Sequence, residues 1–213
     1  MSFIRFGSVI GFACVTAMPA CGSSSSDGDS GPVVNPNPTS QLVTLNPDNT
    51  IPDQNFSGLG ASGSISVSYF SDPVLGSTGF AYAWGNVEGT DDFLGVAGIH
   101  ATSTPGDAIT TGAVTYDGRY DLLRVRGNVE DQQSGQIELT ATFNSGRVTG
   151  SADGLEVNGT FSGNVTAMGG TVTFDGVTAN MEGVVGQDRV VGAFAGDDAD
   201  GILIGGIYGA VTP

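Results

Sequence analysis

The sequence predicts an all-β protein in which an N-terminal tether precedes a soluble, antiparallel up-and-down barrel of about eight strands. Val, Ile, Thr, Phe and Tyr occur in short runs that alternate with polar residues, and turn residues separate the runs. Gly is frequent, at 35 of 213 residues, and has no collagen period. No segment has a sustained helical period, and both Gly and the β-branched residues disfavour a helix.

The first residues have the pattern of a bacterial secretion signal. Residues 6–18 are apolar or small after a single Arg, and Met18-Pro19-Ala20-Cys21 resembles a lipobox. This apolar run is too short to cross a membrane as a mature helix. We therefore predict a lipoprotein signal peptide at residues 1–20 and a lipid on Cys21, which would anchor the chain to a membrane. The alternative is an ordinary signal peptide that is cleaved after Ala17.

Charge and cysteine content exclude several functions. The formal net charge is −16 and all six basic residues are Arg, so we expect no nucleic-acid partner. The two cysteines, Cys14 and Cys21, both lie at the N-terminus. The mature chain therefore cannot use an intrachain disulfide, a thiolate metal site or a catalytic Cys, and we expect no metal and no cofactor.

Residues 21–60 form the predicted disordered tether. Ser, Asp, Asn, Pro and Gly dominate this segment, which cannot bury enough apolar surface to fold alone.

Residues 61–107 are predicted to be a small β region. Residues 64–70 alternate between apolar and polar, and residues 93–100 form an apolar run. Between them, Phe80, Tyr82 and Trp84 lie on one face of a strand. Such a face is usually core, but on an edge it would be a protein-binding hot spot, so these three residues are candidates for a binding surface. The region forms either a separate small sheet or the first barrel strands.

Residues 108–213 are predicted to form the barrel. Asp117 and Gly118 are expected to make a turn between the first two strands. Closure is expected between the last strand and an early one, because an open sheet would leave two exposed edges. The expected strands are residues 111–117, 119–127, 136–144, 147–152, 156–161, 170–174, 179–185, 189–195 and 202–211.

Three segments of this second region have a family resemblance. They are TGAVTYDG at residues 111–118, GQIELTATF at 135–143 with VTG at 148–150, and GAFAGDDA at 192–199 with GGIYG at 205–209. In order and spacing they resemble the β-barrel domain of the transferrin-binding protein B family of bacterial surface lipoproteins, which includes factor H binding protein. The sequence departs from that family at residues 200–204, where DGILI replaces a shorter acidic step.

The resemblance implies a binding function without catalysis. Family members pair the barrel with a smaller handle sheet and bind host iron carriers, haem proteins or complement regulators outside a Gram-negative cell. It thus implies a lipid-anchored outer-membrane protein on the cell surface, or on the periplasmic face, with an extracellular protein ligand. The contact residues of the family lie in variable loops, so none is transferred to this chain.

Charged residues and the single histidine are weaker candidates for a binding, metal or catalytic site. Arg119, Arg124 and Arg126 form either ion pairs with neighbouring acidic residues or a basic patch for an acidic partner. His100 is the only histidine, so a His-based metal site or a Ser-His-Asp triad lacks a partner, and we expect a strand residue there. The acidic segment at residues 197–201 misses the ligand spacing of a Ca²⁺ loop and reads as a solvated turn.

The leading functional hypothesis is a membrane-anchored, non-catalytic binding module for an extracellular macromolecule. The alternatives are a structural or adhesive envelope lipoprotein and a periplasmic carrier that holds a small apolar ligand inside the barrel. No constellation of catalytic residues is present, so we expect no enzyme activity.

Overall fold

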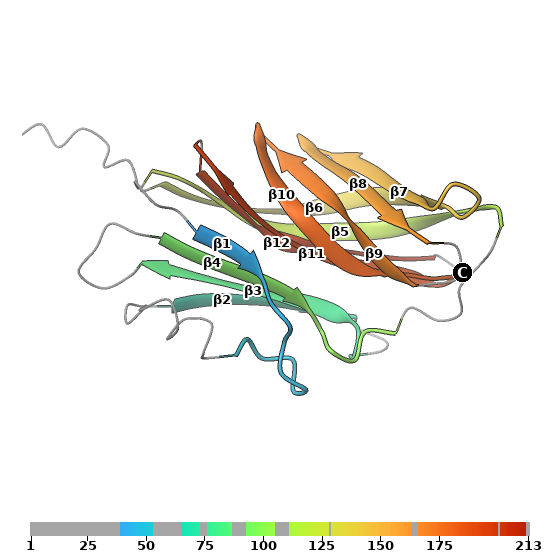
Figure 1. The fold of residues 1–213 in the computed structure, drawn as a ribbon, viewed down its shortest axis with the longest axis horizontal. Helices are drawn as coiled ribbons and strands as arrows, with labels where there is room; N and C mark the ends of the chain where they lie inside the picture. Colours follow the sequence, from blue (N-terminus) through green and yellow to red (C-terminus); the bar gives the residue numbers. More distant parts are fainter. Residues whose placement is uncertain are drawn as a thin grey trace, which may run out of the picture. The chain divides into compact units, whose positions relative to one another are not determined.

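Twelve strands in two sheets make up the described part of the chain (Figure 1). The structure is a computed structural model, and it describes residues 39–52, 65–72, 76–86, 93–104, 111–127, 129–162, 166–199 and 201–211. These residues contain no helix, and so none that is long and apolar enough to cross a membrane. The signal peptide and Cys21 lie outside the described residues.

The first sheet has four strands in the order β1-β4-β3-β2. β3 pairs antiparallel with both β2 and β4, whereas β1 pairs parallel with β4. The strands are β1 (Thr39–Leu42), β2 (Ile65–Ser71), β3 (Gly79–Asn86) and β4 (Phe93–Ile99).

Residues 39–42 correct one sequence-based expectation. They fall within the predicted tether, yet they form β1 and pair with β4. The physical reason is a partner far along the chain, whose main-chain groups complete a ladder that local composition does not reveal. The strands of residues 65–99 belong to this separate sheet and not to the barrel, which settles the alternative left open by the sequence.

The second sheet closes into an antiparallel barrel in the order β10-β11-β12-β5-β6-β7-β8-β9. The last strand pairs with the first strand of the barrel, as predicted, so the barrel has no free edge. Its strands are β5 (Ala113–Arg126), β6 (Val129–Thr142), β7 (Arg147–Ala152), β8 (Leu155–Phe161), β9 (Ala167–Phe174), β10 (Val177–Val185), β11 (Arg189–Asp198) and β12 (Gly201–Ala210).

The predicted turn at Asp117 and Gly118 is wrong, because β5 runs through both residues without interruption. Gly118 has another role there. A Cβ on this residue would lie 3.1 Å from the carbonyl oxygen of Ile137 and closer still to that of Tyr208. The glycine therefore allows β6 and β12 to approach β5 from both sides, as a tightly curved barrel requires.

Burial patterns show which strands the first sheet covers. β8 and β10 alternate between buried and exposed residues, as expected for strands with one face inside the barrel and one face in solvent. β11 is buried continuously over residues 190–195, and β12 is buried over residues 201–209. Their inner faces join the barrel core, and their outer faces pack against β3 and β4.

Side chains fill the inside of the barrel. Tyr116, Leu122, Leu139 and Phe194 are among the largest residues of this core, and none is measurably exposed. The barrel is thus a packed scaffold, as small barrels of eight strands are.

Candidate binding surface

The aromatic residues of β3 lie between the sheet and the barrel. Phe80, Tyr82 and Trp84 alternate along the strand and are 1%, 0% and 8% exposed. They pack in one cluster with residues of β5, β11 and β12, such as Leu123 and Ile204. The structure therefore places these three candidates in the core, which was the favoured of the two sequence interpretations, and they offer little surface to a partner.

Hydrogen bonds connect these aromatic residues to the barrel. Tyr82 donates its hydroxyl to Asp121 Oδ1 at 2.8 Å and accepts from Gln132 Nε2 at 3.0 Å. Trp84 Nε1 donates to Glu130 Oε2 at 2.9 Å. Burial, together with the charge of Asp121, raises the pKa of Tyr82 well above its ordinary value. Each buried polar tip thus has a partner, and the contacts fix the sheet on the barrel.

A second polar cluster lies at the end of β2. Asp72 is 2% exposed, and its Oδ2 accepts from Arg189 Nε at 2.7 Å and from the Tyr208 hydroxyl at 2.5 Å. Burial, followed by the contact with Asp72, raises the pKa of Tyr208 to about 12. The cluster ties the first sheet to β11 and β12. The sequence does not point to these residues, because nothing local in it links positions so far apart.

The three arginines of β5 do not form one patch. Arg119 is exposed, and its Cζ lies 5.3 Å from the ring centroid of Phe70 on β2. Arg124 has the opposite strand parity, so it lies on the inward side, where its Cζ is 5.9 Å from the Phe174 ring centroid. It pairs with Asp131 at 3.6 Å and with Asp175.

Arg126 is exposed near the end of β5 and has the same strand parity as Arg124. The ion-pair interpretation is confirmed for Arg124. Of the three residues, Arg119 is the one that faces the first sheet from the outside of the barrel.

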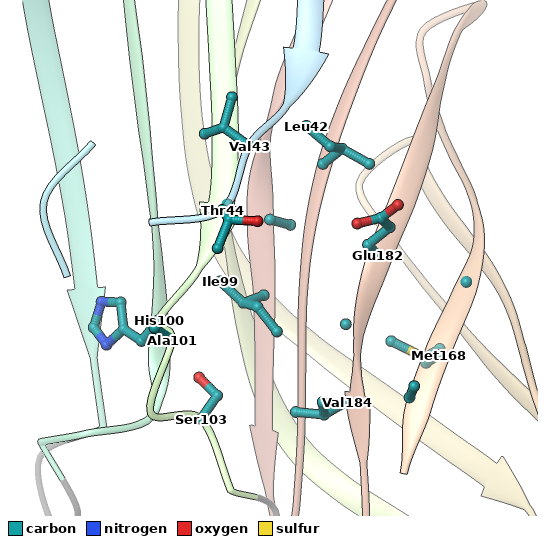
Figure 2. A pocket seen from close by; sticks show the side chains of 15 residues that line it. Leu42, Val43, Thr44, Ile99, His100, Ala101, Ser103, Met168, Glu182 and Val184 are labelled. Carbon is teal, nitrogen blue, oxygen red and sulfur yellow. The ribbon is translucent and has the colours of Figure 1, made fainter. Parts of the chain in front are cut away.

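A groove of about 620 Å³ separates the β1–β4 side of the sheet from β9 and β10 of the barrel (Figure 2). Leu42, Ile99 and Val184 give it apolar walls, and Glu182 provides a carboxylate. Figure 2 shows the ring of His100 pointing away from Glu182, so these two groups do not converge on one point.

His100 follows β4 directly and is 2% exposed. Neither ring nitrogen has a hydrogen-bond partner in the described part of the chain. Burial lowers the pKa of His100, so the imidazole is held in its neutral form. The ring packs close to the backbone of Gly79, where it acts as a core residue.

The acidic segment at residues 197–201 begins in the last two residues of β11, and it has a structural contact. Asp197 Oδ1 accepts from both the backbone nitrogen and the hydroxyl of Ser40, each at 3.0 Å, which fixes β1 against the barrel. Asp198 pairs with Gly201 across the hairpin, and Asp200 lies outside the described residues. Within the described ranges, no group of three or more His, Cys, Asp or Glu side chains could hold a metal ion.

No model of a known protein family matches the chain, and no curated protein is significantly similar to it. Solved structures are similar in fold. The haemoglobin receptor HpuA from Kingella denitrificans aligns with 66% of this chain and 56% of its own, at 18% identity and a TM-score of 0.44. A mutant of transferrin-binding protein B from Haemophilus parasuis aligns with 72% of this chain and 38% of its own, at 14% identity and a TM-score of 0.49.

Transferrin-binding protein B from Neisseria meningitidis aligns with 72% of this chain and 36% of its own, at 11% identity and a TM-score of 0.45. The chain thus spans just over half the length of the receptor and less than two fifths of either transferrin-binding protein. These matches include the family that the sequence resembles. These TM-scores are all 0.49 or lower, so the fold of the chain is described from its own strand pairing.

Proposed function

We propose that this chain is a membrane-anchored, surface-exposed lipoprotein that acts as a non-catalytic binding module for an extracellular macromolecule. The observation that supports the proposal is the filled barrel. Because side chains such as Tyr116 and Phe194 occupy the interior, a ligand must bind on the outside of the barrel or on the sheet. The lipobox-like junction at Cys21 supplies the anchor in this proposal.

The proposed ligand is a protein, as the family resemblance implies. The matched structures are a haemoglobin receptor and transferrin-binding proteins, and those ligands belong to those proteins. For this chain we propose only the class. A chain of net charge −16 repels nucleic acid, so nucleic acid is not the proposed ligand.

The filled interior also argues against the small-ligand carrier. Such a carrier needs an apolar cavity inside the barrel, whereas the grooves lined by described residues lie outside it.

The test compares two kinds of probe on the full chain, purified in detergent. One probe is an apolar fluorescent dye. The other is the protein fraction of the fluid in which the native cells live, passed over the immobilised chain. We expect saturable retention of a protein and no stoichiometric binding of the dye. One dye molecule bound tightly per chain would overturn the proposal in favour of a carrier, and retention of neither probe would favour a structural lipoprotein.

A further inference from the structure

The outer edge of β2 has main-chain groups that no described strand uses. β2 lies at one end of the sheet, and among the described strands it pairs with β3 alone (Figure 1). The Asp72 nitrogen donates to the Thr78 carbonyl oxygen at 2.8 Å, so even-numbered residues of β2 bond to β3. Because bonded pairs alternate in an antiparallel ladder, Tyr69 and Ser71 direct their N–H and C=O groups to the open side.

This edge lacks the features that usually block strand pairing. Its sequence, ISVSYFS, contains no charged residue and no Pro. Charges, prolines and bulges are the common means by which proteins protect an edge. Tyr69 is 56% exposed and is one of the few large apolar residues in that state among the described residues. The opposite edge differs, because Ser40 of β1 is bonded to Asp197 of the barrel.

A hollow lies beside the open edge, where an added strand would run. The floor is formed by the outer faces of β5 and β6 at Arg119, Ser134 and Gln136, and the wall is formed by Tyr69 and Phe70 of β2. This hollow has a volume of about 410 Å³. A second one of about 670 Å³ continues it toward Tyr208 and shares Phe70, Arg119 and Gln136 with the first. We call the two together the β2 groove.

Arg119 gives the β2 groove a charge preference. Its guanidinium rests over the Phe70 ring, and no carboxylate among the described residues forms an ion pair with it. The Arg189 guanidinium, in the second hollow, is already paired with Asp72. Two carboxylates of the outer face of β5 also line the groove, Asp117 in the second hollow and Asp121 in the first, and Asp121 accepts from Tyr82 and Ser68. Arg119 is thus the cation available to a carboxylate from outside.

We propose that the β2 groove binds an extended peptide segment of a partner protein, which adds a strand to β2 and places an Asp or Glu side chain on Arg119. Strand addition is an established mode of peptide recognition, in which main-chain hydrogen bonds supply affinity and side-chain positions supply specificity. This inference rests on the proposed function, because it names the surface with which the binding module holds its protein ligand.

The test uses a displayed library of random ten-residue peptides, selected on the full chain in detergent. We expect the enriched peptides to share one acidic position and to lack Pro around it. One enriched peptide is then synthesised with Glu or with Gln at that position. The Glu peptide should bind roughly tenfold more tightly, as expected for one charge-assisted hydrogen bond.

Two variants separate the side-chain and main-chain parts of the site. Arg119→Gln should lower the affinity for the Glu peptide about tenfold and leave the affinity for the Gln peptide unchanged. The effects of Arg119→Gln and of the Glu-to-Gln change in the peptide are then not additive. Arg147→Gln, at another exposed arginine on β7, is the matched control and should change nothing. Tyr69→Pro removes an outward N–H and should abolish binding of both peptides, whereas Tyr69→Ala keeps that N–H and should retain binding.

Circular dichroism and urea midpoints show whether each variant is folded, and Arg119→Gln remains informative if Tyr69→Pro does not fold. The proposal is overturned if no peptide is enriched, if the enriched peptides share no acidic position, or if Arg119→Gln binds like the unchanged chain. A dimer of the chain that Tyr69→Pro dissociates would also overturn it, because the occupant would be a second copy. If a protein ligand is retained equally by all these variants, the proposed function stands and the β2 groove is not its site.

Discussion

Replacing Gly206 with alanine should weaken the packing of the first sheet on the barrel. Gly206 lies in β12, directly under the Phe80 ring of β3. An alanine Cβ would lie 2.6 Å from Phe80 Cδ1 and closer still to two other ring carbons. Carbon atoms in contact are normally 3.5–4.0 Å apart, so the ring would have to move by about 1 Å.

The Phe80 ring has little room to move. It is 1% exposed, and it stacks on the Phe70 ring at a centroid distance of 5.4 Å. Overpacking of this kind typically costs about 1–3 kcal/mol. We therefore expect Gly206→Ala to lower the free energy of unfolding by that amount in urea denaturation, with an unchanged slope against urea.

Gly169→Ala is the matched control for this prediction. Gly169 lies in β9, and the nearest atom to an added Cβ is the Met181 carbonyl oxygen at 3.8 Å, an ordinary contact. This variant should be neutral or more stable by about 0.4–1 kcal/mol, because alanine reduces the entropy of the unfolded chain. Adding Phe80→Leu to Gly206→Ala should recover part of the loss, since the pair is in contact. Equal urea midpoints for the two glycine variants would refute the packing described between β3 and β12.

Three further predictions concern the polar contacts between the two sheets. Tyr82→Phe should lower the free energy of unfolding by about 1–3 kcal/mol, because Asp121 and Gln132 each lose a partner, and an unchanged thermal midpoint would contradict that. Asp72→Ala should lower the free energy of unfolding, measured in urea, by about 3–5 kcal/mol, because it leaves the Arg189 guanidinium without its carboxylate. A decrease below about 1 kcal/mol would show that water replaces this contact. The pKa of Tyr208, raised to about 12 from 10.0, predicts a stability contribution that is complete below pH 10 and is lost as the pH rises toward 12. Urea midpoints measured across that range should fall less steeply for Tyr208→Phe, and identical slopes would contradict the assignment.

Most of the barrel is predictable from the sequence, because most of its strands have their own local pattern, but residues 129–135 of β6 were not expected to be in a strand. Residues 147–152 were placed with the bounds of β7, and the closure of the last strand onto an early one is confirmed. A strand with one face in the core and the other in solvent alternates between apolar and polar residues, so it can be recognised from the sequence.

Features that depend on distant partners were not predicted. The sequence of β1 predicts a tether, because its four residues have no strand pattern of their own and are stabilised by pairing with β4. The prediction of a turn at Gly118 was wrong, because the sequence does not distinguish a glycine that allows close strand packing from a glycine that forms a turn. In the same way, the contact of Asp72 with Arg189 joins residues that are far apart in the sequence, so only the fold brings them together.

The candidate site was predicted in part. Phe80, Tyr82 and Trp84 were recognised as one face of a strand, but only the packing against β12 shows that this face is covered. The three arginines of β5 are close in sequence, yet strand alternation sends Arg119 and Arg124 to opposite sides of the barrel wall.

Antibody labelling of intact native cells is the most direct test of the central claim, that the chain is a binding module held outside the cell by a lipid on Cys21. The unchanged chain and Cys21→Ala are compared, with lysed cells as the control for total protein. We predict that intact cells are labelled and that Cys21→Ala is lost from the cell into the medium. Labelling that appears only after lysis would place the domain in the periplasm and contradict the account.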